Sequence, residues 1–359
     1  MMLVKFEFTQ LTPWFFKANT TFEKGTWGYT HKLPPISTLI GAMRSALGKL
    51  LKVDWEKYRS GKSSDIERVI GKYGTQEELP FVVYGPFVGK GNDVYFPLSA
   101  ILKVYEISKD GQAEIDNVVR AEMFDEEYEY EGGVRLKIWG GLPSKKEAKG
   151  YWLTMCGMNA FLKGEDDEIY KRNEETKEEE IKEIEKLSFA SVVEEIGVNI
   201  DRDRWAGGDE NAMYRIRRVF MNPGYKIVAY AYFTGEVDVP FGSVDIPFGG
   251  RGGMSRVKVS CGENIVRCWI ERKGNLAYLG SPHYMNWKGL PLPDGDVVAA
   301  SVGKPIPYRM LAPGINPEKS TGIVRHLAPQ GSVYVWKIPP EGEVRNMPMF
   351  WGGMEDGDR

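Results

Sequence analysis

The sequence predicts an α+β fold with antiparallel sheets. Three observations lead to this prediction. Glycine and proline are frequent, at 41 and 21 residues in a chain of 359, which favours turns and strands over a bundle of helices. The apolar periodicity gives one strand and one clear helix near the amino terminus, followed by many short alternating segments. Few helical patterns separate those later segments, so the regular strand–helix alternation of a parallel sheet is missing.

The first two elements are a strand and a helix. Residues 3–8 alternate between apolar and polar side chains, as in a half-buried strand. A helix is expected from Ile36 to about Leu51, because two prolines precede it and hydroxyl side chains at 37 and 38 suit its capping. Its polar side carries small residues around one arginine, which would let a subunit, a sheet or a ribose-phosphate chain approach: Ser37, Gly41, Arg44 and Gly48.

The connection between that strand and that helix, residues 12–32, is rich in aromatic residues. Aromatic rings could stack on bases, and Lys17 and Lys32 could hold phosphates. For any single ring, packing in the core is the more common arrangement. The rings are Trp14, Phe15, Phe16, Phe22, Trp27 and Tyr29.

The middle of the chain is predicted to consist of strands and charged insertions. Residues 54–73 form a polar, partly helical excursion, and residues 81–107 form strands broken at Gly85-Pro86 and Phe96-Pro97. Residues 122–141 look like a peripheral hairpin or insertion. Residues 165–196 are expected to be a charged stretch leading into a helix, with an apolar stripe at Ile181, Ile184, Leu187, Val192 and Ile196.

Residues 198–220 predict an arginine-bearing hairpin. Arg202 and Arg204 precede a Gly-Gly turn, and Arg215 shares a strand face with Arg217. Arginine offers bidentate phosphate contacts and planar stacking, but ion pairs with nearby aspartates explain the pattern equally well. Further strands are expected at 225–234, 264–270, 297–301 and 332–338.

The stretch 247–260 combines a glycine-rich loop with a basic strand. Four glycines surround Arg251, and glycine permits positive φ and a close backbone approach: Gly249, Gly250, Gly252 and Gly253. In the strand that follows, Arg256 and Lys258 share one face and valines share the other. This combination suits a sugar-phosphate chain, and a plain hairpin loop with solvated charges is the simpler alternative.

The acidic residues are segregated along the chain. The formal net charge is −3, but residues 122–131 and 165–186 contribute −6 each, so the remainder carries +9. A mildly basic body is compatible with a nucleic-acid partner. Two acidic segments of this kind are usually solvated.

Several classes of protein are excluded by what the sequence lacks. Its three cysteines form no CxxC pair, and its three histidines do not lie at metal-ligand spacing, so neither a disulfide scaffold nor a zinc site is expected. No phosphate-loop, HExxH or GxSxG motif occurs. No signal peptide and no apolar run of membrane-spanning length is found, so a soluble, cytoplasmic chain without a membrane partner is expected.

Four stretches, in this order, resemble the repeat-associated mysterious proteins (RAMPs) of CRISPR systems. The closest likeness is to the third subunit of the type III-B (Cmr) effector complex. The matching stretches are the helix entry at 33–44, the central segment 197–214, the glycine-rich loop at 248–256 and the Gly-Ser-Val-Tyr strand within 328–334. The likeness runs nearly end to end, and the ordered set is more specific than any one motif.

The resemblance implies two packed ferredoxin-like (RRM-like) halves, with antiparallel sheets. We expect residues 1–160 to form the first half, with an insertion at 122–141, and residues 191–359 the second. Residues 161–190 would be a charged insertion or helix between them.

The resemblance also implies a non-catalytic subunit that grips the 5′ repeat-derived tag of a CRISPR RNA in antiviral defence. Its protein partners would be the large polymerase-like subunit and a backbone RAMP subunit. No catalytic residue, metal ion or cofactor is expected. The candidates for RNA contact are Arg44, Gly249, Gly250, Arg251, Gly252, Gly253, Arg256, Arg202, Arg204, Arg215, Lys17 and Lys32.

Two alternatives stay open. RAMP relatives include metal-independent endoribonucleases that process CRISPR RNA, in which a histidine after the first strand can act as general base on a ribose 2′-hydroxyl. His31 lies in about that place, although a lone histidine is more often structural. The other alternative is a purely structural bridge between protein subunits, with the RNA held elsewhere.

Overall fold

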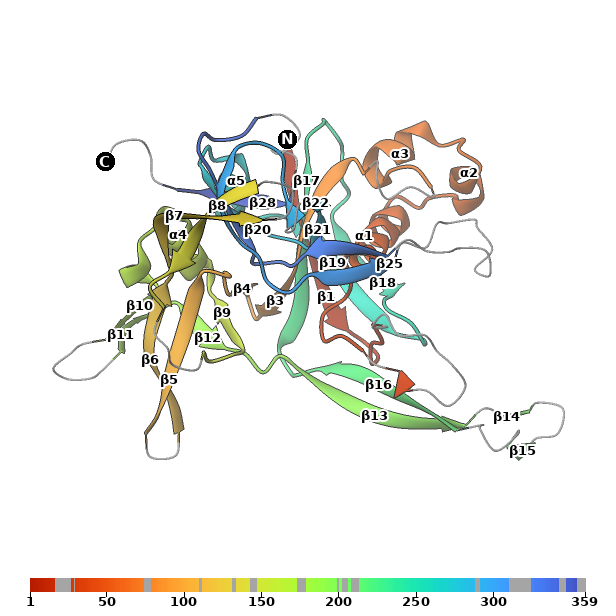
Figure 1. Ribbon diagram of the computed structural model, residues 1–359. Helices are drawn as coiled ribbons and strands as arrows, with labels where there is room; N and C mark the ends of the chain where they lie inside the picture. The colour runs from red at the N-terminus through yellow and green to blue at the C-terminus, as the bar shows by residue number, and fades with distance from the viewer. Residues whose placement is uncertain are drawn as a thin grey trace.

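An eight-stranded sheet forms the central layer of the computed structural model (Figure 1). The structure describes residues 1–16, 27–28, 30–73, 79–109, 112–130, 134–142, 147–172, 179–198, 200–201, 206–207, 213–287, 291–309, 324–341 and 347–353. Every neighbouring pair in the central sheet is antiparallel. In spatial order the strands are β12 (Ile184–Lys186), β9 (Tyr151–Leu153), β4 (Asp93–Pro97), β3 (Phe81–Lys90), β17 (Tyr225–Phe233), β1 (Met2–Gln10), β19 (Met254–Cys261) and β18 (Gly242–Pro247).

Helix α1 (Ile36–Leu50) covers one face of this sheet. Alternate residues of β1, such as Phe6 and Phe8, share a buried cluster with Leu39 and Leu47 of α1. The helix begins where predicted, but Pro35 is its N-cap and no hydroxyl caps it, contrary to our expectation. The predicted helical excursion follows as α2 (Trp55–Arg59) and α3 (Ser64–Ile70).

The other face of the central sheet packs against α4 (Met155–Lys163), α5 (Asn264–Glu271) and a second sheet. Tyr84 of β3 and Phe350 of the second sheet stack with ring centroids 5.0 Å apart, so both sheets share one core. The second sheet runs in the order β28 (Met349–Gly352), β20 (Leu276–Leu279), β27 (Val333–Trp336), β24 (Val297–Ser301), β8 (Val134–Gly140) and β7 (Glu122–Tyr130).

The remaining described strands form small sheets and hairpins around these two layers. One hairpin, which we call the arm, extends far from the body at the lower right of Figure 1 and consists of β13 (Ala190–Val198) and β16 (Met213–Met221). The others are β2 (Trp27–Gly28), β5 (Leu102–Lys109), β6 (Gln112–Arg120), β10 (Tyr170–Arg172), β11 (Glu179–Lys182), β14 (Ile200–Asp201), β15 (Ala206–Gly207), β21 (His283–Tyr284), β22 (Asn286–Trp287), β23 (Pro291–Leu292), β25 (Ile306–Arg309) and β26 (Val324–Ala328), with a 3₁₀ helix at Asp166–Glu168.

The described architecture is thus α+β with mainly antiparallel sheets and few helices, as the sequence predicted. The central sheet takes strands from both ranges that were expected to form separate halves, since β1 and β3 lie in 1–160 and β17 and β19 in 191–359. No helix in the described part of the chain is long and apolar enough to cross a membrane.

Three local predictions were wrong. In the described parts of 165–196 no α-helix forms: Ile181 lies in β11, Ile184 in β12, where it pairs with Leu153, and Val192 and Ile196 lie in β13. Residues 264–270 form helix α5 rather than a strand, because Val266, Trp269 and Ile270 bury one helical face. Strand β3 continues through the cis Gly85-Pro86 bond that was expected to interrupt it.

Candidate nucleic-acid interface

The glycine loop, residues 248–253, joins β18 to β19 and is anchored by one buried ring. Phe248 is 1% exposed, and its ring centroid lies 4.8 Å from that of Phe8 and 5.1 Å from that of Trp14. Burying a phenylalanine side chain contributes about 1.5–3 kcal/mol. The loop is therefore fixed to the core at its first residue, while Gly250, Arg251 and Gly252 are exposed at its tip.

The loop backbone requires glycine at particular positions. Gly249 and Gly252 have φ of +80° and +78°, and Arg251 itself is left-handed at +59°. A Cβ on Gly253 would lie 2.4 Å from the carbonyl oxygen of Phe248. Within the described residues, the amides of Gly249 and Gly252 have no protein acceptor. Left-handed turns with unused amides are typical of anion-binding concavities.

Three neighbouring segments hold the loop in place. The Gly250 amide donates to the Phe15 carbonyl at 2.9 Å, and the Thr12 hydroxyl donates to the Gly252 carbonyl at 3.0 Å. The amide of His31 donates to the Phe16 carbonyl at 3.0 Å, which places the exposed residues His31 and Lys32 beside the same segment. The residues that follow β1 therefore bring the loop and the entry to α1 together.

The base of the arm meets the loop from another side. Arg218 of β16 donates from Nη1 to the Arg251 carbonyl at 3.2 Å, and its Nε lies 2.6 Å from a Glu195 carboxylate oxygen. Val219 exchanges two backbone hydrogen bonds with Trp14, at 3.0 and 2.8 Å. The arm, the loop and the segment after β1 thus form one hydrogen-bonded surface.

The basic strand after the loop is largely paired with carboxylates. Arg256 makes two hydrogen bonds to Asp245, at 2.8 and 3.0 Å, which lower the pKa of Asp245 and raise that of Arg256. Lys258 Nζ lies 3.9 Å from a carboxylate oxygen of Glu7. The half-buried Lys226 also pairs with Glu7. This face therefore alternates in charge.

Arg44 has a structural position. Its guanidinium donates to the Tyr58 hydroxyl, to the Gly71 carbonyl at 3.3 Å and to the Lys72 carbonyl at 2.5 Å. These bonds tie α1 to α2 and to the end of α3. The stripe of small residues around it is also partly filled, because the Trp55 ring would lie 2.5 Å from a Cβ on Gly48.

The structure brings together some predicted site residues and leaves others undescribed. Gly249 to Gly253, Arg251 and Lys32 lie on or beside the surface just defined, and Arg256 lies on the strand after it. Lys17, Arg202 and Arg204 lie outside the described residues, as does the side chain of Arg215, whose backbone belongs to β16. Trp14, Phe15 and Phe16 are buried, so they pack in the core.

Two residues that organise this surface were not singled out from the sequence. Phe248 carries no signal beyond being apolar beside glycine, and its burial depends on β1. Arg218 lies on the strand face opposite Arg217, and its contact with the loop depends on the fold rather than on any local pattern. The Arg256–Asp245 pair did have a signal, since the register of a β18–β19 hairpin places the two residues opposite each other.

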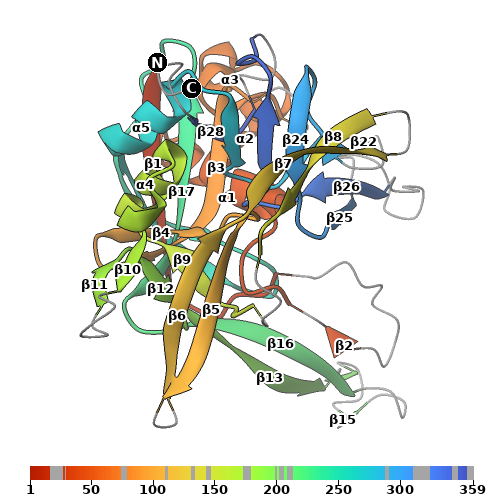
Figure 2. The same cartoon turned by 60° about the vertical axis from the view of Figure 1, so that its left-hand side comes forward.

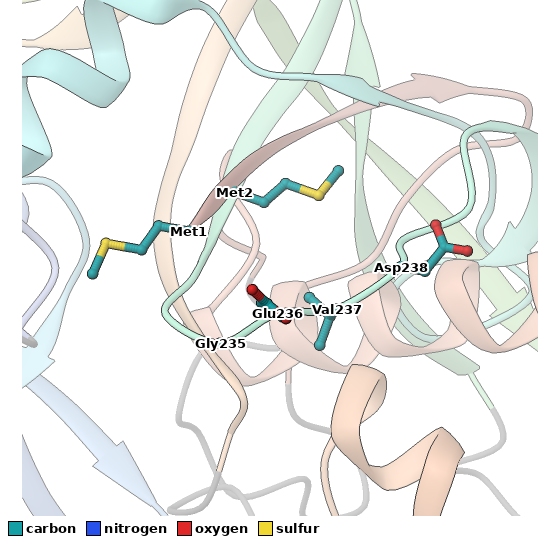
Figure 3. A pocket seen from close by; sticks show the side chains of 6 residues that line it. All are labelled: Met1, Met2, Gly235, Glu236, Val237 and Asp238. Carbon is teal, nitrogen blue, oxygen red and sulfur yellow. The ribbon is translucent and has the colours of Figure 1, made fainter.

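Two properties of the described residues matter for catalysis, namely the pKa of His31 and the capacity to bind a metal ion. Desolvation lowers the pKa of His31 below its usual value, so the imidazole stays neutral to lower pH. Across the described ranges, no three His, Cys, Asp or Glu side chains gather where they would hold a metal ion. The open hollow in Figure 3 lies at the opposite end of β1 and carries Glu236 and Asp238 but no basic side chain. It does not suit a phosphate.

Comparison with known proteins gives one family match. A family model described as CRISPR-associated protein (Cas_Cmr3) matches residues 6–356. A search among curated proteins returned no match.

Similar chains occur in solved CRISPR complexes. Two are in cryo-EM structures of the type III-B Cmr-beta bound to cognate target RNA, the second also with AMPPnP. They are 13% and 15% identical, with TM-scores of 0.46 and 0.45, and each alignment covers 93% of this chain and 86% of that one. A chain in a crystal structure of the type III-A Csm3-Csm4 subcomplex is 10% identical over 98% of this chain and 97% of its own, with a TM-score of 0.47.

The family match decides the assignment, because it extends over nearly the whole chain and includes every stretch on which the sequence resemblance depended. The chain therefore belongs to the Cas_Cmr3 family of CRISPR-associated proteins, RAMP-type subunits of the type III-B (Cmr) effector complex.

Proposed function

We propose that this chain is a non-catalytic subunit that holds the 5′ repeat-derived tag of a CRISPR RNA on the surface around the glycine loop. The observation that carries the proposal is the conformation of the loop. Its tip is exposed and partly left-handed, it has unused amides, and it is anchored by the buried Phe248. A phosphate cradle that is already ordered loses little entropy when RNA binds.

The charges around the loop support a backbone-directed contact. Arg251 at the tip and Lys32 beside it supply exposed cations. Single-stranded RNA is commonly held by such cations and amides along its phosphates, with a few bases splayed onto side chains. Arg256 would contribute only if RNA replaced its Asp245 partner. Contacts by Arg44, Lys17, Arg202, Arg204 and Arg215 stay predictions.

We also propose that the layers correspond to two ferredoxin-like halves. The order β3-β17-β1-β19, with α1 on one face, fits one such half, in which residues 91–224 are inserted between β3 and β17. Strand β18 stands where a second crossover helix would be expected. The second sheet with α4 and α5 would belong to the other half.

The protein partners of the whole chain in the cytoplasm would be the large polymerase-like subunit and a backbone RAMP subunit.

The test is a charge reversal at the loop. Arg251→Glu combined with Arg256→Glu should weaken binding of labelled tag RNA at least tenfold and reduce the slope of log K against log salt by about 1 per lost phosphate contact. Arg251→Glu alone should account for most of the effect, because Arg256 is already paired. The matched control is Arg267→Glu on α5, another exposed arginine in an ion pair. Unchanged affinity in a complex that still assembles would favour the structural bridge.

The endoribonuclease alternative has its own test. His31 is exposed beside the loop, and its lowered pKa keeps the imidazole neutral and able to accept a proton, while it also makes the imidazole a weaker base. The pure protein is incubated with repeat RNA in EDTA, and we expect no specific cleavage. Specific cleavage that is abolished by His31→Ala would overturn the non-catalytic assignment.

A further inference from the structure

Strand β7 is an exposed edge with an unusual composition. It lies at the end of the second sheet, and no other strand in the described part of the chain pairs with its outer edge (Figure 2). Eight of its nine residues are exposed. An exposed edge strand presents unpaired backbone donors and acceptors, and natural proteins usually protect such an edge with charged side chains, proline, a β-bulge or a covering element. Strand β7 contains neither lysine nor proline; its charges are all acidic, and its register shift between Met123 and Glu127 leaves residues 127–130 as the regularly paired part of the edge.

The charge of this edge is negative throughout. Of its five acidic residues, Asp125 lies 2.8 Å from Lys137 Nζ and Glu129 lies 3.4 Å from Arg135, both on β8. Glu126 and Glu127 have no ion pair among the described residues. Exposed ion pairs of this kind contribute little stability, so cations of a partner can replace them.

Apolar and aromatic side chains are exposed between these acids. Met123, Phe124 and Tyr128 are 40%, 41% and 58% exposed. The Phe124 ring lies against Gly140, where a Cβ would come within 2.2 Å of it, so the ring occupies space that only glycine leaves open. Tyr128 packs edge-on against Tyr130, with centroids 5.1 Å apart. Exposed aromatic rings on an open edge are typical of protein interfaces.

The charge selects among the possible occupants of this edge. Two copies of β7 would place acidic residues against acidic residues, which destabilises a strand pair. RNA would bring phosphates against the same carboxylates. An extended segment rich in lysine or arginine would pair its backbone with the edge and its cations with the unpaired glutamates.

We propose that β7 is a docking edge that takes up a basic, extended segment of a protein partner by strand addition to the second sheet. This surface is separate from the glycine loop and does not depend on the RNA-binding proposal. It also gives a role to the acidic stretch 122–131, which RNA binding leaves unexplained.

The experiment uses the full chain and a fluorescein-labelled octapeptide of alternating lysine and valine as the probe. Anisotropy titrations should show saturable binding that Glu126→Lys with Glu127→Lys weakens at least tenfold. The matched control is Asp167→Lys with Glu168→Lys, an equal charge change at two exposed acids outside β7. This control variant should bind as the wild type does. An equal loss in both variants would reduce the effect to general electrostatics and overturn the proposal.

Two further measurements test the backbone pairing itself. The same peptide with alternate N-methylated amides keeps its charge but loses donors, and it should bind at least tenfold more weakly. Hydrogen exchange of the amides in β7 should slow when the unmodified peptide binds. Equal binding of the methylated peptide, unchanged exchange in β7, or protection of β7 by tag RNA instead of by the peptide would each contradict strand addition.

Discussion

Gly253→Ala tests whether the glycine loop depends on one fixed backbone conformation. The new Cβ would lie 2.4 Å from the Phe248 carbonyl oxygen, and because that atom belongs to the backbone, the loop must shift. The shift disturbs two hydrogen bonds, from the Phe248 amide to the Gly253 carbonyl at 2.8 Å and from the Gly253 amide to the Gly250 carbonyl at 3.3 Å. One such bond contributes about 0.5–1.5 kcal/mol, and overpacking costs about 1–3 kcal/mol. We expect a net loss of about 2–3 kcal/mol in the free energy of unfolding.

The functional consequence is measured on the same variant. Urea unfolding gives the stability, and anisotropy gives the affinity for tag RNA, which should fall at least tenfold because the substitution changes the left-handed loop conformation that exposes the unused amides. The control is Gly235→Ala, a glycine with no atom within 4 Å of its Cβ position and no positive φ, which should change neither quantity. A Gly253→Ala protein with the expected loss of stability but wild-type RNA affinity would refute the role given to the loop.

Three predictions concern the rest of the structure. Desolvation lowers the pKa of His283 from 6.5 to about 4. The neutral side chain therefore contributes its full stability above pH 6.5. As the pH falls from 6.5 to 4, the unfolded chain takes up a proton that the folded chain does not, and the free energy of unfolding falls by about 3 kcal/mol. Urea unfolding of His283→Gln should show a flatter pH profile in that window, and an unchanged profile would contradict the desolvation of this half-buried imidazole. Gly41→Ala should raise the stability by up to about 1 kcal/mol, since the added methyl meets open space in α1, whereas Gly48→Ala should lower it, because Trp55 occupies the site. Thermal melts that shift both variants in the same direction would contradict this packing. Arg44→Met should cost about 2–3 kcal/mol by removing three hydrogen bonds, and urea unfolding that matches the wild type would show that these bonds contribute little.

The parts of the fold that were predicted correctly are those fixed by local periodicity. Strands β1, β17 and β24 and helix α1 each carry their own alternating or helical pattern, and the structure places them within one or two residues of the predicted bounds. The hairpin at 122–141 was also correct, as β7 and β8.

The parts that failed depend on distant partners. The apolar residues between 181 and 196 are spaced roughly as on a helix. In the structure, however, Ile184 pairs with Leu153 of β9, β11 pairs with β10, and β13 pairs with β16. A single sequence does not contain those pairings. The pairing of β17 with β3 is of the same kind, since it joins two strands across an insertion of more than a hundred residues.

In the candidate site, too, the features set by local sequence were predicted and the contacts between distant segments were not. The sequence predicted an exposed, glycine-flanked Arg251 at a hairpin turn, because glycine content and alternation are local. It did not predict the anchoring of Phe248 among Phe8, Trp14 and Phe16, or the reach of Arg218, because each contact joins segments far apart in the chain.

Photo-cross-linking of 4-thiouridine-labelled tag RNA to the full chain, with mass-spectrometric mapping of the linked peptides, tests the central claim most directly. The account predicts cross-links in residues 248–256 and 30–32, reduced by Arg251→Glu. Cross-links confined to other surfaces, or unaffected by that substitution, would contradict it.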